Sequence, residues 1–217
     1  MNRTVSNFLA IGSGIGLTLK LTFGSLFIGV GIGLLFAVLR YNGICKIIVN
    51  AIIEILRGTP LMLQLCFAFL VTPSIFGVRI DLLWAGILAF GINASAFFAE
   101  VFRAGIESLP KGQFEAAQAL GIPRFYMWRD IILPQVAANI LPAMINEIIA
   151  LVKSTALIGS IGGMDIMRKA QLVGAEQYQY LKPLCIAAVY YYVLVLLIGW
   201  VGKKIERRRP YAKNSQC

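Results

Sequence analysis

The sequence contains no histidine, and only 14% of its 217 residues are charged. Without imidazole the chain can form no His-based catalytic triad, no His metal ligand and no imidazole proton relay. Its four cysteines lack CxxC spacing, so we expect neither a disulfide framework nor a metal site. A GxxxxGK[ST] phosphate loop is also missing, because the glycines before Lys203 are wrongly spaced. We therefore expect a chain that hydrolyses no ATP, holds no cofactor and is not itself an enzyme.

Apolar residues are abundant instead. They make up 59% of the sequence, and the mean hydropathy is +0.78. Lysine and arginine number 20 against 10 aspartates and glutamates, an excess that could serve nucleic acid, an anionic membrane surface or membrane topology. The hydropathy favours the membrane, and no nucleic-acid partner is expected.

Five apolar runs approach the length of about 20 residues that a membrane-spanning helix requires. They cover residues 21–39, 47–71, 82–102, 136–161 and 184–201. The second run is interrupted by Arg57-Gly58-Thr59-Pro60, so it should be a broken span. The sequence thus predicts an all-α integral membrane protein whose residues 1–217 form one transmembrane domain.

The basic residues predict the orientation. With these spans, twelve lysines and arginines lie on the side of the membrane that also holds residues 203–213, and five lie on the other side. Cytoplasmic loops carry the excess of positive charge. We therefore expect the C-terminus in the cytoplasm and the N-terminus outside, with the basic end also contacting lipid headgroups.

The loop at residues 104–135 has a helical pattern of its own, and long structured loops are usually functional. Pro110 breaks the chain, residues 113–120 form a short predicted helix, and Gly121 fits its C-terminal cap. Pro123 suits the first turn of a second helix. The pattern predicts two helices joined by a glycine turn.

Within this loop stand Glu115-Ala116-Ala117, then Gly121, and finally Ile131 and Leu133-Pro134. This pattern resembles the EAA loop of bacterial ABC importer permeases, in which a coupling helix docks into a groove on a cytoplasmic ATPase. The resemblance implies that the ATPase-coupling residues here are Glu115, Ala116, Ala117, Leu120, Gly121 and Ile122.

Three further segments, residues 57–61, 93–106 and 141–157, are similar to polar amino-acid permeases of the histidine, glutamine and arginine branch. One departure is Phe97, where such permeases often have tyrosine. The resemblance implies a type I importer fold in the bacterial plasma membrane, paired with an identical or paralogous second permease subunit. It also implies a cytoplasmic ABC ATPase dimer that binds ATP and Mg, and an extracytoplasmic amino-acid-binding protein docking on residues 73–81 and 162–182.

Polar side chains inside the spans form stripes at helical spacing, which indicates faces that avoid lipid. A zwitterionic amino acid needs an acceptor for its ammonium group and donors for its carboxylate. The candidate substrate-binding residues are Gln64, Asn93, Glu100, Asn146, Glu147, Lys153 and Ser154. Structural ion pairs, within the chain or between subunits, are the alternative role for the charged ones.

Two other functions fit parts of the sequence. An ion-gradient-driven secondary transporter or channel subunit would use Glu100, Glu147 and Lys153, but leaves residues 115–134 without a role. A membrane scaffold leaves the polar stripe of the fourth span unexplained. The substrate also stays open, because Glu147 favours a cationic amino acid and Lys153 an anionic or zwitterionic one.

Overall fold

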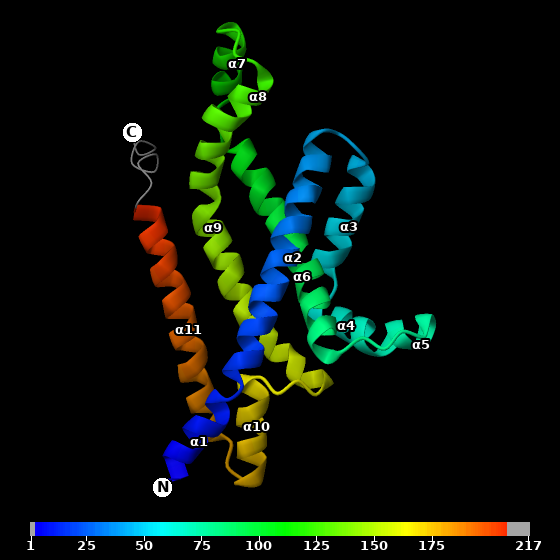
Figure 1. Cartoon of the computed structure of the whole chain (residues 1–217), viewed down its shortest axis with the longest axis vertical. Helices are drawn as coiled ribbons and strands as arrows, with labels where there is room; N and C mark the ends of the chain where they lie inside the picture. The colour runs from blue at the N-terminus through cyan, green and yellow to red at the C-terminus, as the bar shows by residue number, and fades with distance from the viewer. Residues whose placement is uncertain (1–2, 208–217) are drawn as a thin grey trace.

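The computed structural model describes residues 3–207, and within that range it is helical, with no strand (Figure 1). Its long helices are α2 (Ile15–Tyr41), α6 (Leu82–Glu107), α9 (Leu133–Ser154) and α11 (Leu181–Arg207). The shorter ones are α1 (Arg3–Gly12), α3 (Lys46–Gly58), α4 (Leu61–Cys66), α5 (Thr72–Phe76), α7 (Lys111–Ala119), α8 (Arg124–Tyr126) and α10 (Ile166–Glu176). Two π-helical stretches, η1 (Phe67–Val71) and η2 (Met127–Ile132), and a 3₁₀ stretch, η3 (Thr155–Ile161), continue neighbouring helices.

The helices run roughly along one axis, and the two ends of the molecule differ (Figure 1). Helices α1 and α10 lie at one end and α7 and α8 at the other, and α11 runs from the first end part of the way toward the second. Among the described residues, four helices are long and apolar enough to cross a membrane, and a fifth span results if the bent pair α3 and α4–α5 counts as one. The structure therefore has the five spans predicted from the sequence only if this bent pair is counted as one span.

The break predicted in the second apolar run separates α3 from α4, and the two segments are bent by 102°. Pro60 has no N–H to continue the helix, and Thr59 before it adopts the extended conformation that a following proline favours. Helices α4 and α5 consequently turn sideways from the bundle (Figure 1).

Helices α2 and α6 form the centre of the bundle, and small residues allow their close approach. A Cβ atom added at Gly33 of α2 would lie 2.8 Å from the Cβ of Phe98 and 2.9 Å from the carbonyl oxygen of Ser95. Gly91 of α6 is equally tight, with the Cβ of Ile28 at 2.9 Å. Without a hydrophobic driving force between helices in lipid, such close packing stabilises the pair.

Around this pair the core contains Leu21, Leu65, Phe90, Phe98, Leu151 and Ile158. Many other large apolar side chains point outward, including Phe27 at 84% exposure and Ile47 at 86%. An outer surface of this kind would be unstable in water and suits contact with lipid or with another membrane subunit.

Candidate functional site

A cavity of about 390 Å³ lies where the break between α3 and α4 faces α6 and α9. Its lining residues are Arg57, Thr59, Leu61, Phe90, Asn93, Ala94, Phe97, Glu147, Ala150, Leu151 and Ser154. Three of the predicted substrate-binding residues, Asn93, Glu147 and Ser154, are therefore brought together. The Oγ of Ser154 donates to the carbonyl of Ala150 at 3.0 Å, which leaves the hydroxyl oxygen as an acceptor toward the cavity.

Gln64 and Asn93 stabilise the break between α3 and α4. The Nε2 of Gln64 donates to the carbonyl of Leu56 at 2.9 Å and to the Oγ1 of Thr59 at 2.7 Å. The Nδ2 of Asn93 donates to the same carbonyl at 2.9 Å and to the Oε1 of Gln64 at 3.1 Å. The last carbonyls of a helix need partners, and lipid supplies none. Gln64 thus acts beside the cavity and does not line it.

Arg57 is a charged cavity residue that the predicted site omitted, although it lies inside the second predicted span, residues 47–71. Its guanidinium carbon lies 5.4 Å from the centre of the Phe97 ring, a cation–π distance. Phe97, the one noted departure from the permeases that the sequence resembles, provides this ring face. Arg57 and Glu147 line one cavity with opposite charges, yet no ion pair joins them among the described residues.

The two other predicted residues of α9 do not line this cavity. Asn146 and Lys153 are exposed on the surface of the single chain. Helix periodicity placed them on the polar stripe, but that stripe is wider than the cavity wall. Their side chains therefore point away from the rest of this chain.

Glu100 lies apart from the cavity, in a network of charges between α2 and α6. Its carboxylate accepts hydrogen bonds from Arg40, and from the Nη2 of Arg103 at 2.7 Å. Arg103 also pairs with Glu107. The pair of Glu100 with Arg103 was predicted from their spacing, whereas Arg40 could not be, because it is 60 residues away in the chain. The alternative of a structural ion pair therefore describes Glu100 better than a place in the cavity.

Glu100 nevertheless borders a second hollow, of about 500 Å³, nearer to the α7 end of the molecule. The same hollow is lined by Asn139 and Ala143 of α9 and by Arg103 and Ser108. The Nδ2 of Asn139 donates to the Oγ of Ser108 at 3.1 Å. Both hollows lie between α6 and α9, so polar surface extends from the broken helix toward the loop.

The loop forms the predicted helix, turn and second helix. After α7, Gly121 has a φ of +68°, its N–H donates to the carbonyl of Gln118 at 3.0 Å, and the N–H of Ile122 donates to that of Ala117 at 3.0 Å. These two bonds define a Schellman motif, which a residue without Cβ adopts at no steric cost. Pro123 precedes α8 as its N-cap, one position earlier than predicted.

The predicted coupling residues divide into an outer and an inner set. Glu115, Ala116 and Gly121 are exposed, and Leu120 is 78% exposed at the end of the loop. Ala117 is only 2% exposed and packs with Leu109, Met127, Ile132 and Val136, while Ile122 is half-buried against that cluster. Ala117 is therefore unavailable for surface contact and instead fixes α7 onto α9.

At the opposite end, Asp165 is fully buried and caps α10. Its carboxylate accepts from the N–H groups of Met167 at 3.2 Å and Arg168 at 2.9 Å, and from the hydroxyl of Tyr191 at 2.9 Å. Burial raises the pKa of the Asp165 carboxyl above its ordinary value of 3.8, an effect that these hydrogen bonds offset only in part. Helix α10 was not predicted, because residues 162–182 were interpreted as an outer loop.

An apolar helical bundle with a polar hollow between its spans and an exposed helical loop at one end defines a membrane component of a transport system. The chain belongs to the family described as the binding-protein-dependent transport system inner membrane component, whose model matches residues 29–210. This assignment confirms the family predicted from the loop and span motifs.

Similar proteins include a putative glutamine transport system permease protein of Rickettsia typhi, 43% identical over 92% of this chain and 93% of the relative. An arginine transport system permease protein of Bacillus subtilis is 40% identical over 94% of each chain. Among solved structures, an amino acid ABC transporter crystallised with histidines matches with a TM-score of 0.86 and 38% identity, over 94% of this chain and 96% of the other. The match confirms the predicted all-α permease fold.

Proposed function

We propose that this chain is the permease subunit of an ABC importer that moves polar amino acids into the bacterial cytoplasm. The cavity between Arg57 and Glu147 supports this function most strongly. An α-amino acid carries a carboxylate and an ammonium group, which Arg57 and Glu147 respectively complement, while the oxygens of Asn93 and Ser154 accept further hydrogen bonds. The relatives named for glutamine and arginine transport agree with such a substrate.

The proposed role of Arg57 changes the argument about substrate charge. The sequence offered Lys153 as the group for a carboxylate, but Lys153 is exposed outside the cavity. With Arg57 facing the carboxylate and Glu147 facing the ammonium, the α-amino acid group is recognised without any charge on the side chain of the substrate. A polar zwitterion such as glutamine then fits as well as a cation.

The energy comes from a separate ATPase dimer, which binds ATP and Mg. We assign the docking surface to the outer set of loop residues, Glu115, Ala116, Leu120 and Gly121, because these are exposed on α7 and its turn. The inner set, Ala117 and Ile122, keeps the surface in place. Leu120 offers the largest apolar side chain of this surface, which suits an anchor in a groove.

The remaining assignments follow from the two ends of the molecule. We place α7 and the basic end of α11 in the cytoplasm, and α1 and α10 outside, where the segments 73–81 and 162–182 receive the amino-acid-binding protein. The exposed Asn146 and Lys153 face the second permease subunit, identical or paralogous. The transmembrane domain then spans the plasma membrane with residues 21–39, 47–71, 82–102, 136–161 and 184–201.

The direct test is to express the chain with the other subunits of its transport system, purify the complex and reconstitute it in lipid. We expect an ATPase to co-purify, and polar amino acids with the binding protein to stimulate ATP hydrolysis and uptake. If no ATPase co-purifies with the wild-type chain, the importer function is wrong and a gradient-driven carrier replaces it.

The docking surface is tested by Leu120→Asp, which places a charge on an exposed apolar side chain and leaves the buried cluster unchanged. Loss of the co-purifying ATPase is expected. Tyr178→Asp is the matched control, since Tyr178 is 97% exposed between α10 and α11, at the other end. ATPase retention by the Leu120 variant, or equal loss from both variants, would contradict the assignment.

A further inference from the structure

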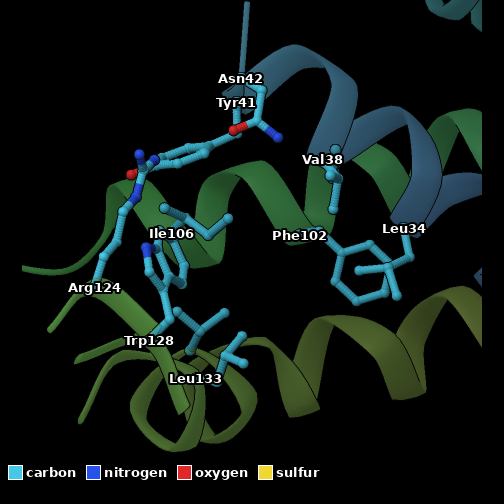
Figure 2. A pocket seen from close by; sticks show the side chains of 11 residues that line it. Leu34, Val38, Tyr41, Asn42, Phe102, Ile106, Arg124, Trp128 and Leu133 are labelled. Carbon is cyan, nitrogen blue, oxygen red and sulfur yellow. The ribbon is translucent and has the colours of Figure 1, made fainter. Parts of the chain in front are cut away.

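An apolar hollow of about 410 Å³ opens at the α7 end of the bundle, between α2, α6 and the start of α9 (Figure 2). It is separate from the cavity and the second hollow described above. The residues that line it are Leu34, Ala37, Val38, Tyr41, Asn42, Phe102, Ile106, Arg124, Trp128, Leu133 and Val136. Leu34, Val38 and Leu133 are each about half exposed, so the hollow opens on the outer surface of this chain.

The hollow has an apolar end and a polar end. Figure 2 shows Leu34 and Phe102 together at one end, and Tyr41, Asn42 and Arg124 at the other. Along α2 the two ends are seven residues apart, which corresponds to about 10 Å of helix. Tyr41 packs edge-on against Trp128 with their ring centres 5.0 Å apart, and such aromatic pairs are typical of the boundary between lipid tails and headgroups.

A basic hollow of about 280 Å³ adjoins the polar end and shares Ala37, Tyr41 and Ile106 with the apolar one. It is lined further by Arg40, Lys46, Arg103 and Glu107. Arg40 and Arg103 are neutralised by Glu100 and Glu107. In the part of the chain that the structure describes, Lys46 and Arg124 form no ion pair, so two positive charges stay uncompensated around Tyr41.

We propose that the joined hollows bind one anionic phospholipid of the bilayer. An acyl chain fills the apolar hollow toward Phe102 and Leu34, and the phosphate lies at the Tyr41 end, where Lys46 and Arg124 are uncompensated. A zwitterionic lipid brings its own cation and gains less from two positive charges. The site is independent of amino-acid transport, and the orientation proposed above decides only that the inner leaflet supplies the lipid.

Charge complementarity selects this occupant. A cytosolic protein could reach Arg124 and Lys46, but the apolar hollow extends along α2 into its membrane-spanning part, where only lipid or another membrane helix reaches. A hollow of about 410 Å³ that extends about 10 Å along α2 is too small for a membrane helix, which with its side chains measures about 10 Å across. A single acyl chain is narrower than a helix.

Quenching of Trp128 fluorescence tests the site, because bromine on an acyl chain quenches only on contact. The assay uses the complete complex in nanodiscs, with Trp84→Phe and Trp200→Phe so that Trp128 is the one tryptophan left in this chain. The same complex with Trp128→Phe gives the background from the partner subunits. Brominated phosphatidylglycerol is expected to quench Trp128 at lower mole fractions than brominated phosphatidylcholine. Equal quenching by the two lipids would overturn the proposal.

Charge variants of the same complex identify the binding groups. Each basic side chain near the headgroups contributes roughly fivefold to the preference for an anionic lipid. Lys46→Gln together with Arg124→Gln should therefore reduce the preference by up to about 25-fold. The single Lys46→Gln, at an exposed position, should reduce it roughly fivefold and serves if the double variant fails to assemble.

Lys203→Gln with Lys204→Gln is the matched control, because it removes two exposed positive charges near the end of α11, on the same proposed side of the membrane but outside the hollows. This variant is expected to keep the preference for phosphatidylglycerol. A preference that survives the loss of Lys46 and Arg124, or that the control removes equally, would show general attraction to the membrane surface and overturn the site.

Discussion

Two sets of opposite charges occur on helices α2, α3, α6 and α9, and the structure pairs only one of them. Between α2 and α6, Glu100 is hydrogen-bonded to both Arg40 and Arg103. In the cavity between α6 and α9, Glu147 and Arg57 face the same space without an ion pair among the described residues. The first set holds two helices together, whereas the second leaves both charges available.

The difference indicates function because a charge out of water is costly unless it is paired. The network of Glu100 satisfies its members within the chain, so no ligand is needed. The charges of the cavity retain unused hydrogen-bonding capacity, which a ligand with complementary charges would complete. Paired charges in a span are therefore a poor guide to a binding site, and separated charges are a better one.

The largest expected effect comes from Glu147→Gln, which removes the proposed acceptor for the ammonium group. A hydrogen bond to a charged group contributes about 1.5–3 kcal/mol, so binding should weaken by roughly 10- to 100-fold. The measurement is the amino-acid concentration that half-maximally stimulates ATP hydrolysis by the reconstituted complex. Glu54→Gln, an exposed carboxylate on α3 that does not line the cavity, is the control. Unchanged stimulation by Glu147→Gln would remove this residue from the site.

Glu100→Gln should instead lower the stability of the folded protein and leave substrate binding unchanged. Breaking a fully buried ion pair costs about 3–5 kcal/mol, and exposed pairs contribute less than about 1 kcal/mol. With side-chain exposures of 20–35% for Glu100, Arg40 and Arg103, we expect a loss of about 2 kcal/mol. Thermal unfolding of the purified complex measures this loss. An unchanged melting temperature with a weakened amino-acid response would reverse the two roles.

Asp165 extends the comparison to a buried carboxylate that has no cationic partner among residues 3–207, and the smallest effect is expected there. Because burial raises its folded-state pKa, the folded state holds the proton more tightly than the unfolded state. Its contribution to stability is therefore fully present below the ordinary pKa of 3.8 and declines as the pH rises through the raised value. In Asp165→Asn this decline should disappear. The measurement is the melting temperature of the wild type and of the variant from acidic to neutral pH. Parallel pH profiles would contradict the prediction.

Much of the fold could be predicted because apolar runs and turn residues are local signals. The run at residues 82–102 lies within α6, and Pro110 and Gly121 bound α7 as their chemistry requires. The 102° bend after α3 could not be predicted, since Pro60 interrupts the helix but the packing of the next segment sets the direction. Helix α10 could not be predicted from an apolar run, because its residues are too polar to form one.

The site could be predicted only in part, because a helical stripe is wider than a cavity wall. Glu147 and Ser154 share one face of α9 and line the cavity, whereas Lys153 lies about 100° around the helix from Ser154 and does not line it. Gln64 was chosen for its amide, which in the structure satisfies the carbonyl of Leu56. The burial of Ala117 could not be predicted either, because the sequence of Ala116, Ala117 and Ala119 does not indicate which alanine faces inward.

The buried anchoring of α7 has a mechanical consequence. Ala117 and Ile132 lock the tip of the loop to the start of α9, so the loop and that helix move as one lever. From Arg124 to Glu147 the lever is about 35 Å long if helical throughout. A tilt of roughly 5° at the tip would displace the Glu147 end by about 3 Å, which is enough to separate a carboxylate from a hydrogen-bonded ligand. If the proposed ATPase docks on this loop, stiffness rather than flexibility is the property through which the loop would transmit force to the cavity.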